Sequence, residues 1–257
     1  MGREPVVVVH RDKKLLAEAI ASRFVTTVVD AQASRGECHL VLTGGSMGIA
    51  LLEAVATSRI RDIIDWAHLD LWWGDERFLP TGHPDRNDTQ ARSALLDSVP
   101  LDPARVHSVA GPDRAIDVDD AARQYAAELA RAAPPGHDLP HFDVVMLGVG
   151  PDAHVASLFP EHPALHETER PTIGVRGAPK PPPERVSLTL RALCSAQAVW
   201  FVVAGADKAG AVALALSGAG PLQAPAGAVE GQRSTIWLLD HAAAQQVPQA
   251  LIRFAGY

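Results

Sequence analysis

The segment FDVVMLGVGPDAHVASLFP, residues 142–160, decides the fold that the sequence predicts. Its run Val144–Val149 is apolar and rich in β-branched residues, as is typical of a strand buried on both faces of a parallel sheet. Glycine and proline end the run, and Asp152 and His154 follow at once. Because ligands of open α/β sheets bind at the carboxyl ends of strands, this position favours a functional site.

Asp152 and His154 together have the chemistry of a general base. An imidazole titrates near neutral pH, and a neighbouring carboxylate can fix which ring nitrogen carries the proton. Such a pair can remove a proton from water during hydrolysis. An aspartate two residues before a histidine also occurs in capped turns with an exposed histidine, and the triplet alone leaves both interpretations open.

Length and composition favour one α/β domain spanning residues 1–257. A chain of 257 residues with 47% hydrophobic residues can bury a large core, and two smaller domains are the alternative. The formal net charge of -7 argues against nucleic acid as a partner, because no basic patch is present to neutralise phosphates. We therefore expect any bound anion to be a small molecule.

The few cysteines and the short N-terminal apolar run exclude several classes of protein. Cys38 and Cys194 are too few for a disulfide framework or a structural zinc site. His137 and His141 lack the spacing of metal ligands. The apolar run near the N-terminus is too short for a signal peptide or a membrane span. These features predict a cytoplasmic protein that is not inserted in a membrane.

Apolar runs and amphipathic segments alternate along the chain, which predicts an α/β architecture. Expected strands cover residues 5–10, 38–42, 69–73, 144–149, 172–175, 185–190, 198–204 and 234–239. Expected long helices cover residues 12–29 and 117–133, with shorter ones after residues 46, 207 and 240 and one ending before residue 100. The proline-rich segments 134–141 and 177–183 are expected to be loops.

A glycine pair follows the second expected strand and precedes a helix. Gly44 and Gly45 allow backbone amides to approach an anion, which the amino end of the helix also favours. Ser46 adds a hydroxyl donor. An ordinary tight turn with Ser46 as the helix N-cap is the alternative.

Charged residues stand beside tryptophans at the end of the third expected strand. In WWGDERFLP, residues 72–80, Asp75, Glu76 and Arg77 follow two tryptophans directly. Loops on rigid scaffolds carry functional residues more often than other segments, so we favour a role in the site over a solvated aspartate–arginine pair.

Lys208 lies where the strand 198–204 leads into a helix. A lysine is disfavoured at the amino end of a helix because its charge opposes the macrodipole. The position therefore suggests an anion between Lys208 and the backbone amides, with a solvated lysine as the alternative. Lys180 lies within the loop 177–183, and Arg176 and Arg185 flank it; these three cations are the alternative candidates if the anion binds elsewhere.

Taken together, these motifs resemble the pattern of 6-phosphogluconolactonases. The resemblance rests on GGS (44–46), WGDERFLP (73–80) with Asn87 downstream, LGVGPDAHVASLFP (147–160), RVSLTL (185–190) and VAGADKAGAV (203–212). The resemblance covers essentially the whole chain in order. The motifs WGDERFLP and LGVGPDAHVASLFP are specific as a pair.

The resemblance implies the fold of a superfamily that includes glucosamine-6-phosphate deaminases, ribose-5-phosphate isomerases and coenzyme A transferases. That fold is a modified Rossmann-like, mainly parallel sheet flanked by helices on both faces. One departure concerns Ala153, because the family usually has glycine between the aspartate and the histidine. We expect a negative φ at Ala153, on the view that the family glycine serves close approach only.

The implied activity is hydrolysis of 6-phospho-D-glucono-1,5-lactone to 6-phosphogluconate in the oxidative pentose phosphate pathway. A lactone is an activated ester, so hydrolysis needs a positioned water, a base and oxyanion stabilisation, but no metal, cofactor or covalent nucleophile. By similarity to the family, His154 is the expected base and Asp152 orients it. Asp75 and Arg77 are expected to line the sugar or polarise the carbonyl, with their roles undivided.

The resemblance also implies a phosphate site. Its expected ligands are Gly45, Ser46 and Lys208, with Arg185 or Arg176 as an additional clamp. Gly44 and Asn87 complete the expected substrate-binding residues.

Two other functions stay open on the same scaffold. A sugar-phosphate deaminase or isomerase would use the same phosphate site, but those sequences have DEY where residues 75–77 here read DER. A non-catalytic sugar-phosphate sensor usually carries a DNA-binding helix-turn-helix, which this acidic chain lacks. The sequence leaves open whether the protein is a monomer or a homodimer.

Overall fold

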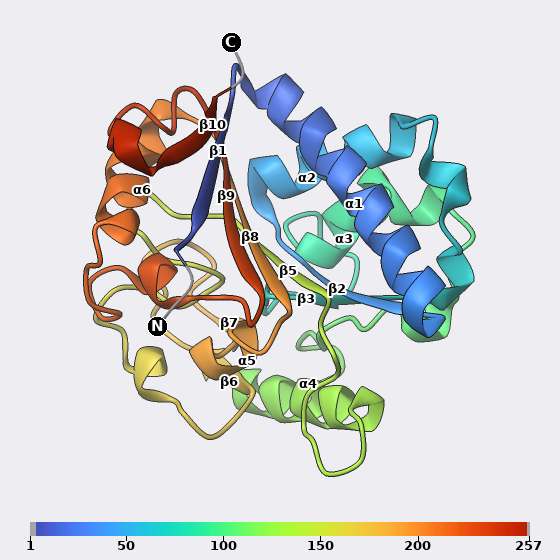
Figure 1. The fold of residues 1–257 in the computed structure, drawn as a ribbon. Coiled ribbons are helices and arrows are strands. Elements are labelled where there is room, and N and C mark those ends of the chain that lie inside the picture. The colour runs from blue at the N-terminus through green and yellow to red at the C-terminus, as the bar shows by residue number, and fades with distance from the viewer. Residues whose placement is uncertain (1–3, 256–257) are drawn as a thin grey trace.

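The computed structural model describes residues 4–255. A seven-stranded sheet forms its centre, with helices on either side (Figure 1). Every neighbouring pair of strands in this sheet is parallel. The strands lie side by side in the order β10 (Ile252–Ala255), β1 (Val6–His10), β9 (Ser234–Asp240), β8 (Ala198–Val203), β5 (Val144–Leu147), β2 (Cys38–Leu42) and β3 (Leu69–Trp73). The expected mainly parallel α/β sheet is confirmed.

Strand β5 lies inside the sheet, between β8 and β2. All its residues are buried, as the apolar run predicted. Alternate side chains enter different cores: Val145 and Leu147 pack into one hydrophobic cluster, and Val144 and Met146 into the other. The sheet therefore separates two cores, and β5 contributes to both.

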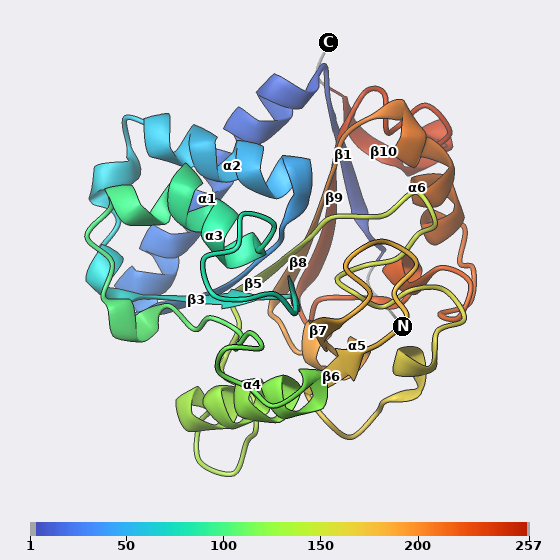
Figure 2. The same ribbon diagram turned by 180° about the vertical axis from the view of Figure 1, so that it is seen from behind.

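Helices cover both faces of the sheet (Figures 1 and 2). One face carries α1 (Lys13–Arg35), α2 (Gly45–Thr57) and α3 (Asn87–Ala94), which pack in that order. The opposite side carries α4 (Val118–Ala132), α5 (Leu190–Leu193) and α6 (Ala209–Leu216). No helix within residues 4–255 combines the length and the apolar character needed to cross a membrane.

Local capping explains where the two longest helices begin. The Asp12 carboxylate accepts a hydrogen bond from the Leu15 amide at 2.9 Å, and Asp117 caps α4 in the same way. Helix α1 ends at Gly36, whose φ of 84° glycine adopts readily. It runs beyond the expected end at Val29 because its last two turns, although mostly polar, still bury Ala31.

A second, three-stranded sheet was not predicted. It consists of β4 (Asp75–Arg77), β7 (Arg185–Leu188) and β6 (Thr172–Val175), all antiparallel. Strand β4 was expected to be a loop, since three residues are too few to show an alternating pattern. Its pairing with β7 places Arg77 opposite Arg185 and Asp75 opposite Ser187.

The C-terminal segment also differs from expectation. A short helix was expected after Asp240, but the chain forms turns, a single 3₁₀ turn at Gln249–Leu251 and then β10. Strand β10 pairs in parallel with β1 at the edge of the large sheet. Pairing between the two ends of the chain is not visible in local periodicity, which is why this strand was missed.

Candidate active site

A cavity of about 390 Å³ opens at the carboxyl ends of β2, β5 and β8 and beside β4. The structure brings almost every predicted site residue to it. Those lining the cavity are Gly44, Gly45, Ser46, Asp75, Arg77, Asn87, His154, Arg185 and Lys208. Asp152 does not line the cavity and instead contacts His154. Arg176 pairs with Asp119 at 2.7 Å and is not part of the lining.

His154 and Asp152 form a hydrogen-bonded pair at the end of β5. The distance between His154 Nδ1 and Asp152 Oδ1 is 2.5 Å, so Nδ1 carries the proton and Nε2 is left as the basic nitrogen. The imidazole also packs on Phe159, with ring centroids 4.5 Å apart. A Cβ atom on Gly150 would overlap the imidazole, so only glycine fits there.

The electrostatic surroundings favour the neutral form of His154. Burial lowers the pKa of His154 below its ordinary value of 6.5, and the charge of Lys180 adds to this effect, while Asp152 opposes it. Burial by itself would raise the pKa of Asp152, but the interaction with His154 lowers that pKa overall. A neutral imidazole beside an ionised carboxylate is the state that general-base catalysis requires.

The backbone at Ala153 contradicts the expectation of a negative φ. Ala153 has a φ of 65°, the left-handed region, and its side chain is fully buried. The Gly150 amide donates to the His154 carbonyl at 2.9 Å, and the Ala153 amide donates to the Gly150 carbonyl at 2.9 Å. This tight turn reverses the chain so that His154 returns over Gly150, and the reversal requires the positive φ.

Asp75 is held by three neighbours at the cavity wall. Its Oδ2 accepts a hydrogen bond from the Ser157 hydroxyl at 2.6 Å and lies 3.9 Å from Arg185 Nη1. The side-chain nitrogen of Asn87, Nδ2, donates to the backbone carbonyl of Asp75 at 2.8 Å. Gly44 must be glycine because a Cβ atom there would overlap the Asn87 side chain. Ser157 was present in the central motif, but its contact with Asp75 has no local signal.

Glu76 is a further residue that the sequence did not assign. Its carboxylate is almost fully buried and accepts hydrogen bonds from the amides of Arg77, Asn87 and Asp88 at 2.8, 2.8 and 2.9 Å. Burial raises the pKa of Glu76 to about 7, although Arg86 and the amides oppose that shift. Glu76 thereby fastens the amino end of α3, and with it Asn87, to β4.

The amino end of α2 is open toward the cavity. Gly44, not Ser46, is the N-cap, and no side chain caps the helix. Gly45 has a φ of 78°, which favours glycine, and Ser46 lies in the first turn. Uncapped amides at a helix amino end are suited to bind an anion. Lys208 lies at the corresponding end of α6, with its ammonium 3.2 Å from Asp207.

The cavity is cationic although the chain as a whole is acidic. Arg77, Lys180, Arg185 and Lys208 line it, and Asp75 is the only carboxylate among the lining residues described. Lys180 is one of the three cations that the sequence leaves as alternative anion ligands, and the structure places it on the cavity wall. This surplus of positive charge favours a strongly anionic ligand.

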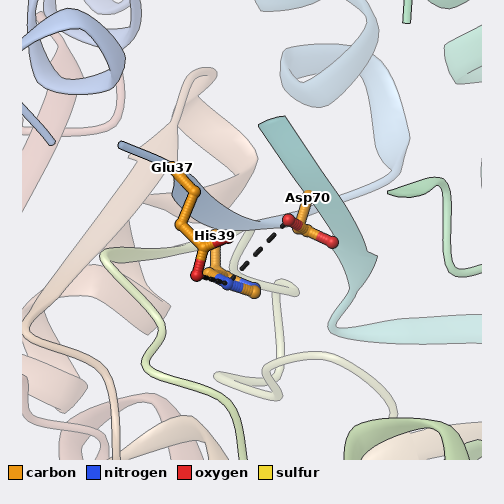
Figure 3. Close-up of side chains that lie close together, drawn as sticks. All are labelled: Glu37, His39 and Asp70. Atoms are coloured by element: carbon orange, nitrogen blue, oxygen red, sulfur yellow. Dashed lines mark ion pairs between the residues drawn. The ribbon is translucent and has the colours of Figure 1, made fainter. Parts of the chain in front are cut away.

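A second polar cluster lies at the amino ends of β2 and β3, whereas the cavity lies at the carboxyl ends of the strands. Figure 3 shows Glu37, His39 and Asp70 close enough to suggest a metal site. However, Trp72 Nε1 donates to His39 Nδ1 at 3.3 Å, so Nε2, which faces both carboxylates, carries a proton. Arg105 already pairs with Asp70 and Glu37. The cluster is therefore an ion-pair network, and its histidine has the wrong tautomer for a ligand.

The fold and the cavity define an α/β protein with a histidine–aspartate pair on the wall of a cavity lined mainly by cationic charged side chains. The family model described as Glucosamine-6-phosphate isomerases/6-phosphogluconolactonase matches residues 11–237. A 6-phosphogluconolactonase of Streptomyces coelicolor is 61% identical over 255 residues, which are 98% of each chain. One of Mycobacterium tuberculosis is 43% identical over 239 residues, covering 92% of this chain and 96% of that one. The chain therefore belongs to the family of glucosamine-6-phosphate isomerases and 6-phosphogluconolactonases.

Solved structures agree with this assignment. The crystal structure of 6-phosphogluconolactonase from Leishmania guyanensis has a TM-score of 0.80 at 26% identity and covers 95% of this chain and 99% of that one. A monomeric glucosamine-6-phosphate deaminase has a TM-score of 0.77 at 16% identity, covering 94% and 99%. The second likeness shows the fold alone.

Proposed function

We propose that this protein hydrolyses 6-phospho-D-glucono-1,5-lactone to 6-phosphogluconate, a step of the oxidative pentose phosphate pathway. The observation that carries the proposal is the His154–Asp152 pair on the wall of a cavity lined by four cationic side chains. The base suits hydrolysis of an activated ester, and the cations suit a phosphorylated substrate. Membership of the lactonase family supports the same conclusion.

In the proposed mechanism, His154 Nε2 takes a proton from the water that attacks the lactone carbonyl. The Asp152 carboxylate holds the imidazole by Nδ1 and stabilises the imidazolium that forms. The tetrahedral intermediate then collapses, the bond to the ring oxygen breaks, and the imidazolium returns the proton to that oxygen. Arg77 is the proposed partner of the developing oxyanion.

Asp75 is the proposed ligand of the sugar hydroxyls. Its carboxylate is fixed by Ser157 and lies beside Asn87, so it can accept hydrogen bonds without reorienting.

The phosphate is proposed to bind Lys208 and the amides near Gly45 and Ser46. We further propose that the protein acts as one α/β domain in the cytoplasm, on a small molecule and without nucleic acid or membrane.

A direct assay tests this function. Freshly prepared lactone is supplied to the protein, and its opening is followed with a correction for the spontaneous reaction. Enzyme-dependent opening is expected, and glucosamine 6-phosphate is expected to release no ammonia. Ammonia release without lactone opening would replace the lactonase by the deaminase alternative, whereas binding of both compounds without turnover would favour a sensor.

A further inference from the structure

Arg86 is a buried arginine that is not among the residues described as lining the cavity. Only 1% of its surface is exposed. Its guanidinium donates from Nη1 to the Leu79 carbonyl at 2.8 Å and from Nη2 to the Val109 carbonyl at 2.6 Å. Because burial of a charge is costly unless the charge is paired and hydrogen-bonded, these contacts determine where the side chain can lie.

The charge of Arg86 faces the buried carboxylate of Glu76. Arg86 Nη2 lies 3.8 Å from Glu76 Oε2, and both side chains are 1% exposed. Burial raises the pKa of Glu76 to about 7, and the charge of Arg86 is the strongest influence that opposes this rise. Arg86 therefore does two separable things: its charge supports Glu76, and its Nη donors hold two backbone carbonyls.

The two hydrogen bonds of Arg86 to Leu79 and Val109 form a clasp at the base of the loop 79–86. Leu79 begins this loop and Arg86 ends it, so the first bond joins its two ends. The second bond fastens the loop to the segment that precedes α4. The Thr81 amide, which donates to Asp113 Oδ1 at 2.9 Å, fastens it to the same segment again.

Gly111 lies where the clasp closes. A Cβ atom on this residue would stand 2.3 Å from the Leu79 carbonyl oxygen and 3.0 Å from Arg86 Nη1. The first of these distances is too short for any Cβ atom, and the atom that it meets belongs to the backbone. The clasp can therefore close only because residue 111 has no side chain.

Arg77 is the cavity residue that the loop 79–86 supports. Its Nη1 donates to the carbonyl of Asp85, the residue before Arg86. The Asp85 amide donates to His83 Nδ1 at 3.1 Å, and the Arg86 amide donates to the His83 carbonyl at 3.0 Å, so the backbone on both sides of the Asp85 carbonyl is fixed. The direction of the Arg77 guanidinium therefore depends on the position of this loop.

We propose that Arg86 is a positioning residue, which holds the Arg77 guanidinium toward the developing oxyanion by clasping the loop 79–86. This inference rests on the proposed function, in which Arg77 is the partner of that oxyanion. A donor stabilises a transition state best when it is already in place, because it then needs no reorganisation at the moment of reaction. Arg86 does not touch the substrate and acts through the loop alone.

Gly111→Ala tests the clasp without a change of charge. The added methyl group must displace the Leu79 carbonyl. We expect kcat to fall by about 10–100-fold with little change in KM, since Arg77 is misplaced for the transition state only. Gly220→Ala should leave both unchanged and is the matched control, because a Cβ atom there would meet no atom within 4 Å and neither glycine has a positive φ. A normal kcat in folded Gly111→Ala would refute the proposal.

Arg86→Met removes the clasp itself. We expect a similar fall in kcat and also a rise in KM, because Glu76, which holds Asn87, loses the charge that faces it. Arg105→Met removes an arginine that pairs with carboxylates far from the cavity and should leave kcat unchanged. A rise in KM without a fall in kcat would show that Arg86 serves Glu76 alone. If Arg86→Met does not fold, Gly111→Ala decides the matter.

A double-mutant cycle shows whether the clasp acts through Arg77. Arg77→Gln should lower kcat by about 10²–10³-fold, the usual cost of one oxyanion donor. If the clasp acts through Arg77, Gly111→Ala should lower kcat no further in the Arg77→Gln background. Losses that multiply would show that the loop acts on a different group, and they would overturn the positioning role.

The pH profile separates the clasp from the catalytic base. Besides burial, the pKa of His154 responds to the charges of Asp152, Lys180 and Asp75, and Gly111→Ala alters none of them. The acid limb of kcat/KM should therefore stay at its wild-type position while the plateau falls. A displaced limb would show that the loop acts on His154, which contradicts the proposal.

Hydrogen exchange separates this inference from the proposed function. In Gly111→Ala, the amides of His83 and Arg86 should exchange faster than in the wild type, while the amides of α1 keep their rates. Unchanged exchange in the loop would refute the clasp even if the wild type opens the lactone. A wild-type protein that opens no lactone would instead refute the proposed function and the role of Arg77, whatever the loop does.

Discussion

Gly150 and His154 lie so close together that a Cβ atom on residue 150 would overlap Nδ1 of the imidazole and the carboxylate of Asp152. The glycine is therefore part of the geometry of the base, although it has no chemistry of its own. Its amide also donates to the His154 carbonyl at 2.9 Å, which closes the turn.

Gly150→Ala should therefore impair catalysis through displacement of His154. We expect kcat to fall by about tenfold or more, since small misplacements of catalytic groups are costly. Gly136→Ala is a useful comparison, because a Cβ atom at residue 136 would meet no other atom and only its φ of 83° would be unfavourable. A Gly150→Ala enzyme with normal kcat would show that the imidazole can move without loss.

His154→Ala removes the proposed base. We expect kcat to fall by about 10²–10⁴-fold, the usual contribution of general-base catalysis, with little change in KM. Steady-state kinetics with fresh lactone measure both quantities, and circular dichroism verifies the fold. Near-normal turnover in the folded variant would exclude His154 from the mechanism.

The pH profile follows from the state of His154. The base must be neutral, and burial lowers its pKa from the ordinary 6.5. We therefore expect kcat/KM to be flat through neutral pH and to fall only below 6.5 as the imidazole becomes protonated. Asp152→Asn removes a charge that raises this pKa, so its acid limb should move to lower pH while the plateau falls. A limb that moves to higher pH would contradict the pairing.

Backbone strain at Ala153 predicts an unusual response to glycine. A left-handed φ costs a non-glycine residue roughly 1–2 kcal/mol, which Ala153→Gly would release. Loss of the buried methyl group and gain of unfolded-state entropy offset part of this, so stability should be unchanged or slightly raised. Ala122→Gly, in the middle of α4, should instead cost about 1 kcal/mol in the free energy of unfolding. Equal losses in the two variants would argue against strain at Ala153.

Glu76→Gln tests the link between β4 and α3. The glutamine nitrogen would face an amide hydrogen, and one buried donor left without an acceptor costs about 1–3 kcal/mol. We expect urea denaturation to show this loss and KM to rise, because Asn87 is held by the same carboxylate. Exposed Glu18→Gln is the control and should change stability by less than about 0.5 kcal/mol. A Glu76→Gln variant with unchanged stability but altered KM would show that Glu76 positions Asn87 without stabilising the fold.

Features with a local signal could be predicted from the sequence. The buried run of β5 and the Asp117 cap of α4 depend on neighbouring residues only, and both are confirmed. The assembly of the strand-end motifs into one cavity is not a local feature, but it could also be predicted, because parallel strands bring their carboxyl ends to one edge of the sheet.

Features that depend on distant contacts could not be predicted. Strand β4 exists because it pairs with β7, more than a hundred residues later in the chain. The left-handed φ of Ala153 depends on the turn that brings His154 onto Gly150, and the place of Lys180 depends on the hydrogen bonds of Arg185. In each case the partner is specified by tertiary structure and leaves no periodic or compositional pattern.

Lys208→Ala distinguishes a sugar-phosphate enzyme from a general esterase. Among the groups of the substrate, the Lys208 ammonium should contact only the phosphate, so its loss should lower kcat/KM for the phosphorylated lactone far more than for glucono-1,5-lactone. One charge-assisted hydrogen bond predicts a loss of about 10–100-fold, and part of it should appear in kcat because remote binding energy positions the reacting carbonyl. Sulfate should inhibit the wild type more strongly than the variant, and Lys14→Ala, at an exposed position of α1, is the control. Equal effects on both lactones, or none, would place the phosphate away from the amino end of α6.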